Sequence, residues 1–246
     1  SYPSTRIDCT SVMWRKKKKW FNGIGRCVLV TPSLWLAEKV QKSYLKEYPV
    51  RVVNNGIDLD VFKPIESDFR KRYNLENKKI VLGVAFEWET RKGLDVFIEL
   101  SEKLPADYQI VLVGTDDTVD KIIPSNILSI HRTQNQQELA QIYTAADVFV
   151  NPTREENYPT VNMEAIACGT PVVTFATGGS PEMINEGCGY VVAKNDCDGL
   201  LKKILLICSS GDVFKKKCLE KALLFDELDK FDNYLAIYRD LLEISK

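Results

Sequence analysis

Two glutamates, Glu156 and Glu164, are the residues of this sequence that are best placed to do chemistry. Glu156 lies in a polar loop that follows an apolar run, and Glu164 lies in the helix that Thr160 is expected to cap. Because residues four apart share a helix face, Glu164 should lie on the same face as Thr160. The helix should end at Gly169, since glycine followed by a proline, here Pro171, is typical of a helix C-terminus.

The segment around these glutamates is expected to form a strand, an acidic loop, a short helix and a second strand. In α/β proteins, a helix that starts just past the carboxyl end of a strand binds phosphates, because its free N–H groups and its dipole point there. Two carboxylates beside such a site would repel a bare phosphate. They suit a ligand that carries hydroxyls on either side of its phosphates, as a nucleotide sugar does.

The composition excludes several other classes. The chain has 246 residues, 45% of them hydrophobic, and a formal charge of −1, which indicates a soluble globular protein with no bias toward nucleic acid. No apolar stretch approaches the roughly 20 residues of a membrane-spanning helix. The seven cysteines are scattered without a C-x-x-C pair, which favours reduced thiols in a cytoplasmic protein over a zinc site. With a single histidine, no metal site is expected.

A basic segment, WRKKKKWF, stands out near the start of the chain. It can be read as a solvated surface turn or helix end. The alternative is a patch that binds anionic lipid headgroups or a phosphorylated acceptor, because basic clusters flanked by aromatic residues suit a membrane interface. That alternative would place the protein at the inner face of the membrane. The cations of the segment are Arg15, Lys16, Lys17, Lys18 and Lys19.

From residue 79 onward, short apolar runs alternate with helical patterns. The expected strands are 80–86, 109–114, 127–131, 147–151, 172–176 and 190–193, and the expected helices are 92–104, 135–145, 160–168 and 181–186. Unbroken apolar strands between amphipathic helices predict a parallel sheet that is covered on both faces. The fold class is therefore α/β, with a Rossmann-like, doubly wound sheet. The G-x-G-x-x-G fingerprint is absent, which disfavours a nicotinamide enzyme.

Three shorter elements are expected before residue 65: a strand at 26–31, a helix at 32–44 and a strand at 50–53. The end of the chain is expected to be helical. There Phe231, Leu235, Tyr238 and Leu242 recur at helical spacing and form one apolar face.

Basic residues also follow two of the expected strands. Arg91 and Lys92 stand just before a helix, where they could neutralise a diphosphate or simply face solvent. His131, Arg132 and Thr133 end the third strand at a pocket rim, although a lone histidine there is often structural.

The last loop of the sheet contains two adjacent glycines, Gly178 and Gly179. Paired glycines allow a close backbone approach to a ligand, and a simple tight turn is the alternative. Ser180 is expected to cap the next helix, with Pro181 at its first position.

Several segments together carry a resemblance to a known family. They are TPSLWLAEKV, VVNNGIDLDVF, RKGLDVF, HRTQNQQELAQIYTAADVFVNPT, the E-x7-E pair, EAIACGTPVV and TGGSPEMI. In this order and spacing they resemble the retaining glycosyltransferases of family 4, which have the GT-B fold of two facing Rossmann-like domains. The resemblance runs from about residue 26 to the last helix.

The resemblance implies roles for the matched residues. Glu164 would bind the ribose hydroxyls of the donor nucleotide, and Glu156 would contact hydroxyls of the transferred sugar. The backbone N–H groups of Tyr158, Thr160 and Val161 would meet the diphosphate, and Lys92 would supply charge. Residues 131–133 would line the base pocket. The resemblance implies no metal or other cofactor, and no enzymic nucleophile, because the leaving phosphate serves as the base.

Two departures from the family pattern concern the phosphate site. The family often has Gly-Arg where this chain has Ala85-Phe86, so one phosphate-binding arginine is missing, and Arg91 or Arg154 could replace it. The usual E-G-F-G also reads E-N-Y-P, and Pro159 has no N–H to donate.

The resemblance also implies a domain organisation. Two such domains need roughly 300 residues or more, so the expectation is a GT-B fold with a truncated N-terminal domain. Residues 1–64 would be the tail of the acceptor domain and the linker, and residues 65–246 the donor-binding domain. The last helix, about 230–245, would cross back to the N-terminal part.

The expected function is that of a hexosyltransferase. It would transfer a sugar, with retention, from a UDP- or GDP-sugar to a glycan or lipid-linked acceptor, a precursor of a cell-surface polysaccharide or glycolipid. One alternative is a truncated module that binds nucleotide sugars without turnover. Another is a GT-B epimerase, over which the E-x7-E loop and the TGGSPE turn favour transfer.

Overall fold

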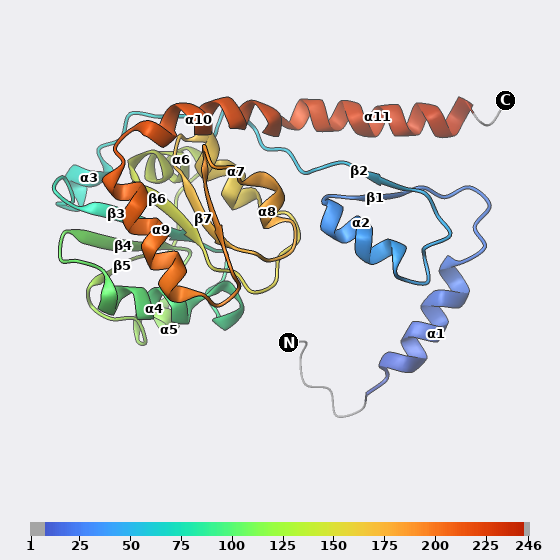
Figure 1. The fold of residues 1–246 in the computed structure, drawn as a ribbon, viewed down its shortest axis with the longest axis horizontal. Coiled ribbons are helices and arrows are strands. Elements are labelled where there is room, and N and C mark those ends of the chain that lie inside the picture. The colour runs from blue at the N-terminus through green and yellow to red at the C-terminus, as the bar shows by residue number, and fades with distance from the viewer. Residues whose placement is uncertain (1–7, 244–246) are drawn as a thin grey trace.

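The structure, a computed structural model, describes residues 8–243 of the chain (Figure 1). Its main body is a parallel sheet of six strands in the order β5-β4-β3-β6-β7-β8. The strands are β3 (Lys79–Val84), β4 (Tyr108–Val113), β5 (Ile127–Ile130), β6 (Val148–Asn151), β7 (Val172–Phe175) and β8 (Gly189–Val192). The predicted doubly wound α/β fold is confirmed. We call this sheet with its helices the sheet domain.

Helices cover both faces of the sheet, as the unbroken apolar strands predict. On one face α4 (Leu94–Lys103) contacts α9 (Cys197–Ser209). On the other, consecutive contacts join α3 (Phe69–Arg72), α6 (Gln136–Ala145), α7 (Thr160–Ala167) and α10 (Val213–Ala222). Two short helices, α5 (Asp117–Asp120) and α8 (Ser180–Met183), follow β4 and β7. All residues of the interior strands β6 and β7 are buried, so these strands lie between both helix layers.

A smaller unit precedes the sheet domain. The strands β1 (Leu29–Thr31) and β2 (Val50–Val52) pair in parallel, and α2 (Leu34–Gln41) connects them. We call residues 29–52 the N-terminal unit. Both predicted strands and the predicted helix exist, with narrower bounds than expected. The basic segment before them forms a helix, α1 (Thr10–Phe21), that has no buried residue.

The linker between the N-terminal unit and the sheet domain packs against the chain segment where the last helix begins. The N–H of Ile57 donates to Phe225 O at the end of the 3-10 turn η2 (Leu223–Phe225), and the N–H of Glu227 donates to Ile57 O. Gly56 is required here, because a Cβ at this position would lie 2.4 Å from Cα of Glu227. The linker and the start of the last helix are therefore packed backbone to backbone.

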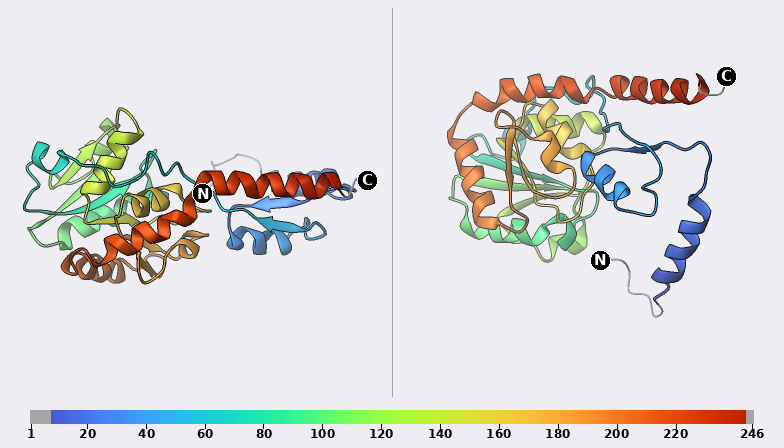
Figure 2. Two further views of the ribbon diagram at one scale, coloured as in Figure 1. Left: turned by 90° about the horizontal axis from the view of Figure 1, so that it is seen from above. Right: turned by 45° about the vertical axis from the view of Figure 1, so that its right-hand side comes forward.

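The last helix, α11 (Glu227–Glu243), leaves the sheet domain and extends on the side of the N-terminal unit (Figures 1 and 2). Its predicted apolar face is exposed: Phe231, Leu235, Tyr238 and Leu242 range from 47% to 68% exposure. The helix was expected to reach residue 245, which lies outside the described residues. Among residues 8–243, no helix is both long enough and apolar enough to cross a membrane.

Some predicted boundaries are wrong by a few residues. Strand β3 ends at Val84, so Phe86 lies beyond the strand and is 95% exposed. The helix expected at 92–104 is split into a 3-10 turn, η1 (Thr90–Lys92), and α4, because Gly93 between them has a positive φ of 82°.

The two predicted N-caps are also wrong, each by one residue. Thr160 is the first residue of α7 and Pro159 precedes it as the cap, while Ser180 is the first residue of α8. The hydroxyl of Thr160 instead hydrogen-bonds the carboxylate of Glu164, one turn further along the helix.

Candidate functional site

The loop between β6 and α7 brings one cation and one anion together at the carboxyl edge of the sheet. The ammonium of Lys92 donates to Oε2 of Glu156 over 2.9 Å. The other oxygen of that carboxylate, Oε1, accepts the N–H of Asn157 at 3.0 Å. Lys92 ends the turn η1 just before α4, so the pair links the ends of two neighbouring strands, β3 and β6. The cation that the resemblance assigns to the diphosphate and the carboxylate that it assigns to the sugar are therefore in direct contact.

The N-terminus of α7 lies next to this pair and has no side-chain cap. The first residues of a helix, here Thr160 and Val161, have N–H groups without an intrahelical acceptor. Pro159 at the cap position cannot supply a capping oxygen from its side chain. An uncapped helix start carries a partial positive charge and suits an anion. Tyr158, the third predicted backbone donor, is buried and immediately precedes Pro159.

Glu164 lies one turn into α7 in a protected environment. The hydroxyl of Tyr143, a fully buried residue of α6, donates to Oε2 of Glu164 at 3.0 Å. Burial raises the pKa of Glu164 above its usual value, an effect that the hydrogen bonds from Tyr143 and Thr160 oppose. The carboxyl group is thus oriented by two hydroxyl groups, and it can accept further hydrogen bonds from a ligand hydroxyl.

The two arginines that could replace the missing family arginine are both paired with carboxylates. Nε of Arg91 donates to Glu89 at 2.8 Å. Arg154 makes a two-pronged contact with Asp95, at 2.8 and 2.7 Å, and also donates to Oδ1 of Asn195 at 2.8 Å. Arg154 therefore holds the acidic loop against α4, and its guanidinium lowers the pKa of Asp95.

A pocket of about 760 Å³ opens at the carboxyl ends of β3, β4 and β5. Four of the predicted site residues line it: His131, Arg132, Thr133 and Val161. Phe86 also lines it and is almost fully exposed. The pocket is large enough for a nucleobase with its ribose, and it reaches Val161 at the uncapped start of α7.

His131 is held by an acidic neighbour at the rim of this pocket. Its Nε2 lies 2.7 Å from Oδ2 of Asp120, and the other oxygen of Asp120 accepts the hydroxyl of Ser129 at 2.5 Å. The hydrogen bond to Asp120 raises the pKa of His131. Asp117, Asp120 and His131 could bring three ligand atoms within 4.8 Å of one another, but all three residues are exposed, and Asp120 and His131 are already hydrogen-bonded to each other.

The adjacent glycines of the last loop pack against protein backbone. A Cβ at Gly178, whose φ is 57°, would lie 1.8 Å from the carbonyl oxygen of Glu156. A Cβ at Gly179 would lie 2.4 Å from the carbonyl oxygen of Asn157. The two glycines are therefore required by close packing against the E-x7-E loop, and their predicted contact with a donor stays a prediction.

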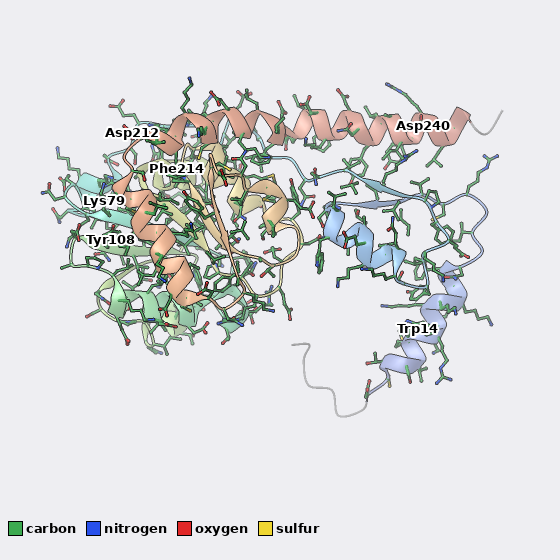
Figure 3. All side chains as sticks on the ribbon, viewed as in Figure 1. Trp14, Lys79, Tyr108, Asp212, Phe214 and Asp240 are labelled. Carbon is green, nitrogen blue, oxygen red and sulfur yellow. The ribbon has the colours of Figure 1, made fainter. Side chains whose placement is uncertain are left out.

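A second pocket, of about 220 Å³, lies away from these residues and from the N-terminal unit. Lys79, Asp212 and Phe214, labelled in Figure 3, are among its lining residues. The cations Arg70 and Lys79 in its wall both pair with Asp147, at 2.5 and 3.5 Å. It has no connection with the site described above.

Several residues that shape the site were not predicted from the sequence. Tyr143 orients Glu164, and Ser33 joins the N-terminal unit to Asn157 of the acidic loop. Glu182 of α8 accepts the N–H of Leu34, and Asn55, just after β2, donates to Tyr158. No local spacing signals these contacts, because the partners lie far apart in sequence.

Together, the fold and the site define a doubly wound α/β domain that offers a nucleoside-sized pocket, an uncapped helix start and two oriented carboxylates at one sheet edge. The model of the family "Glycosyl transferases group 1" matches residues 78–210. This range is more than half of the chain, and the chain belongs to that family.

Individual relatives agree with this membership. The chain is 28% identical over 204 residues to a D-inositol 3-phosphate glycosyltransferase of Mycobacterium sp. strain JLS, which covers 77% of this chain and 46% of the relative. The chain thus spans about half the length of the curated relatives that it matches.

Solved structures share the fold. Sucrose-phosphate synthase from Thermosynechococcus elongatus superimposes with a TM-score of 0.82 at 24% identity, over 98% of this chain and 65% of that one. The Anabaena protein HepE in complex with UDP gives a TM-score of 0.80 at 17% identity, over 94% and 68% of the two chains.

Proposed function

We propose that this chain binds a nucleoside diphosphate sugar and forms the donor-binding part of a retaining hexosyltransferase. The observation that carries the proposal is the position of the Lys92–Glu156 pair beside the uncapped start of α7. A diphosphate at that helix start would meet Lys92 and the backbone N–H groups, while a sugar attached to it would meet Glu156. Glu164 and the pocket at residues 131–133 would receive the ribose and the base.

UDP is the preferred nucleotide of this proposal, and GDP is its alternative. The support for UDP is that HepE, which shares the fold, has been crystallised with UDP and with UDP-glucose. We further propose that binding needs no metal, because the helix dipole and Lys92 stabilise the diphosphate. The acceptor would be a glycan or lipid-linked precursor of a cell-surface polysaccharide or glycolipid.

Calorimetric titration of the 246-residue chain with UDP, GDP and ADP in the presence of EDTA tests donor binding. We expect saturable binding of UDP that does not change when a divalent cation replaces EDTA. Failure of all three nucleotides to bind would overturn the proposal. Binding that requires the cation would overturn its metal-independent form.

A second candidate function is binding of a nucleotide sugar without turnover. It needs only the donor-side contacts described above, the Lys92–Glu156 pair beside the start of α7. Incubation with UDP-glucose, with and without sugar acceptors, separates the two functions by release of UDP. A chain that binds UDP-glucose and never releases UDP would support the second.

We also propose that the protein binds peripherally to the cytoplasmic face of an anionic membrane. The helix α1 supports this part of the proposal. Its cations lie on a helix that also exposes Met13, Trp14 and Trp20, at 43%, 49% and 63%. Aromatic side chains and a basic cluster on one exposed helix suit the headgroup region of a bilayer. Figure 3 places Trp14 on this helix, away from the sheet domain.

A further inference from the structure

Side-chain contacts join the N-terminal unit to the acidic loop and the turn that flanks it. The hydroxyl of Ser33 donates to Oδ1 of Asn157 at 2.8 Å. The two carboxylate oxygens of Glu182, in α8, accept the N–H groups of Leu34 and Trp35, each at 2.9 Å. These partners are more than a hundred residues apart in sequence, so the contacts depend on how the N-terminal unit sits on the sheet domain.

The N-terminus of α2 is fully occupied by these contacts. Glu182 satisfies its first two N–H groups, and Oγ of Ser33 accepts the N–H of Leu36 at 3.2 Å. A carboxylate at a helix N-terminus is stabilised by the helix dipole and by charge-assisted hydrogen bonds. The start of α2 is therefore an anchor point that the sheet domain holds, and it offers no free site for an anionic ligand.

Asn157 connects this anchor point to the predicted sugar-binding carboxylate. Its side-chain oxygen accepts from Ser33, its carbonyl oxygen accepts the N–H of Gly179 at 2.7 Å, and its own N–H donates to Oε1 of Glu156 at 3.0 Å. One residue thus touches the N-terminal unit, the glycine turn and Glu156. The orientation of the backbone peptide group at Asn157 therefore determines the direction of the N–H that binds Glu156.

The packing around Asn157 leaves little room for independent movement. A Cβ at Gly179 would lie 2.7 Å from Cβ of Ser33, so this turn fits directly against the start of α2. Nδ2 of Asn55, which follows β2, donates to the carbonyl oxygen of Tyr158 at 3.2 Å. Displacement of the N-terminal unit would therefore displace the backbone of residues 157–158.

We propose that Asn157 is a positioning residue that makes the orientation of Glu156 depend on the seating of Ser33. The inference rests on the proposed function and extends it. Contact with the donor sugar, made by Glu156, depends on the N-terminal unit more strongly than contact with the nucleotide, which is made mainly by α7 and the base pocket. The sugar is held in the correct position only when the N-terminal unit is seated on the loop.

Paired calorimetric titrations with UDP and UDP-glucose test this coupling in wild type, Ser33→Ala, Asn157→Ala and the double variant. We expect each single variant to bind UDP within about twofold of wild type and to bind UDP-glucose about three- to tenfold more weakly, the range of one neutral hydrogen bond. Because both variants remove the same bond, the double variant should be no weaker than Asn157→Ala.

The matched control is Asn54→Ala. Nδ2 of Asn54 donates to the carbonyl oxygen of Pro32 at 2.8 Å, so this bond lies beside the same helix start but does not reach the acidic loop. It should leave the ratio of the two affinities unchanged. Equal losses for UDP and UDP-glucose, additive effects in the double variant, or unchanged UDP-glucose binding would each overturn the inference while leaving donor binding intact. Absence of UDP binding in the wild type would overturn the proposed function as well.

Discussion

The ammonium of Lys92 lies 2.9 Å from Oε2 of Glu156, so the cation proposed to meet the donor diphosphate is neutralised by the carboxylate proposed to meet the donor sugar. Both side chains are mostly buried, at 25% and 19% exposure, yet they remain accessible to a ligand. A nucleotide sugar can replace the pair without leaving either charge unpaired, because its phosphate binds the ammonium and its hydroxyl binds the carboxylate.

The first prediction concerns the carboxylate of this pair. Glu156→Gln removes the charge that neutralises Lys92 and keeps a similar shape. UDP should then bind as tightly as to wild type or a few-fold more tightly, since the ammonium is released. The affinity for UDP-glucose relative to UDP should fall, because the carboxylate that meets the sugar is gone. Calorimetry with both ligands measures this. Weaker UDP binding in the variant would show that Glu156 does not compete for Lys92.

The second prediction concerns the cation. Lys92→Ala should weaken UDP binding about tenfold or more, because a hydrogen bond to a charged group contributes about 1.5–3 kcal/mol. Uridine, which has no phosphate, should bind as it does to wild type. Arg91→Ala is the matched control, because that arginine is paired with Glu89. Equal losses for UDP and uridine would exclude a phosphate role for Lys92.

The sheet could be predicted from the sequence because six unbroken apolar runs leave few alternatives to a parallel sheet that is covered on both faces. The same topology predicts Lys92 and Glu156 at one edge of the sheet, but it does not predict the ion pair between them. The caps at Thr160 and Ser180 were not predicted correctly, since propensity alone does not show that the Thr160 hydroxyl is used by Glu164. Arg154 could not be assigned, because its partner Asp95 is brought near only by the fold.

The third prediction uses the raised pKa of Glu164. When the pKa of a carboxyl group is raised in the folded state, its contribution to stability is fully present at pH values below the unfolded pKa. This contribution is lost as the pH rises through the raised folded pKa. Glu164→Gln has no such loss, so its melting temperature relative to wild type should rise with pH across that range and then level off. Paired carboxylates such as Asp95 behave in the opposite way, but they are common to both proteins and cancel in the difference.

The same variant should bind UDP about tenfold or more weakly, because an ionised carboxylate accepts ribose hydroxyls better than an amide does. A variant that melts at a higher temperature but binds UDP more weakly would show that Glu164 serves ligand binding and lowers the stability of the folded protein. An unchanged affinity would remove it from the site.

The fourth prediction concerns the basic helix α1. Sedimentation with vesicles that contain an anionic lipid should capture the chain at low salt and release it at high salt, since each surface cation contributes about 1 kcal/mol. Replacing Lys16, Lys17, Lys18 and Lys19 by glutamine should abolish capture. The matched control replaces four cations of α10, Lys215, Lys216, Lys217 and Lys221, and should leave capture unchanged. Equal capture of all three proteins would exclude α1 as the contact.

The fifth prediction follows from the sole histidine of the chain, which makes its titration directly observable by proton NMR. The hydrogen bond to Asp120 is the main cause of the raised pKa of His131, with smaller contributions from Asp117 and Asp116. Asp120→Asn should therefore lower the pKa of His131 toward its ordinary value, and Asp117→Asn should lower it less.

The stabilising effect of the His131–Asp120 pair has a defined sign. It is fully present below the unfolded pKa of the imidazole and is lost as the pH rises through the raised folded value. Because both side chains are exposed, only a small change in melting temperature is expected from it. Equal shifts of the His131 pKa in the two variants would mean that the combined negative charge of residues 116–120 raises this pKa. The specific hydrogen bond to Asp120 would then be rejected as the main cause.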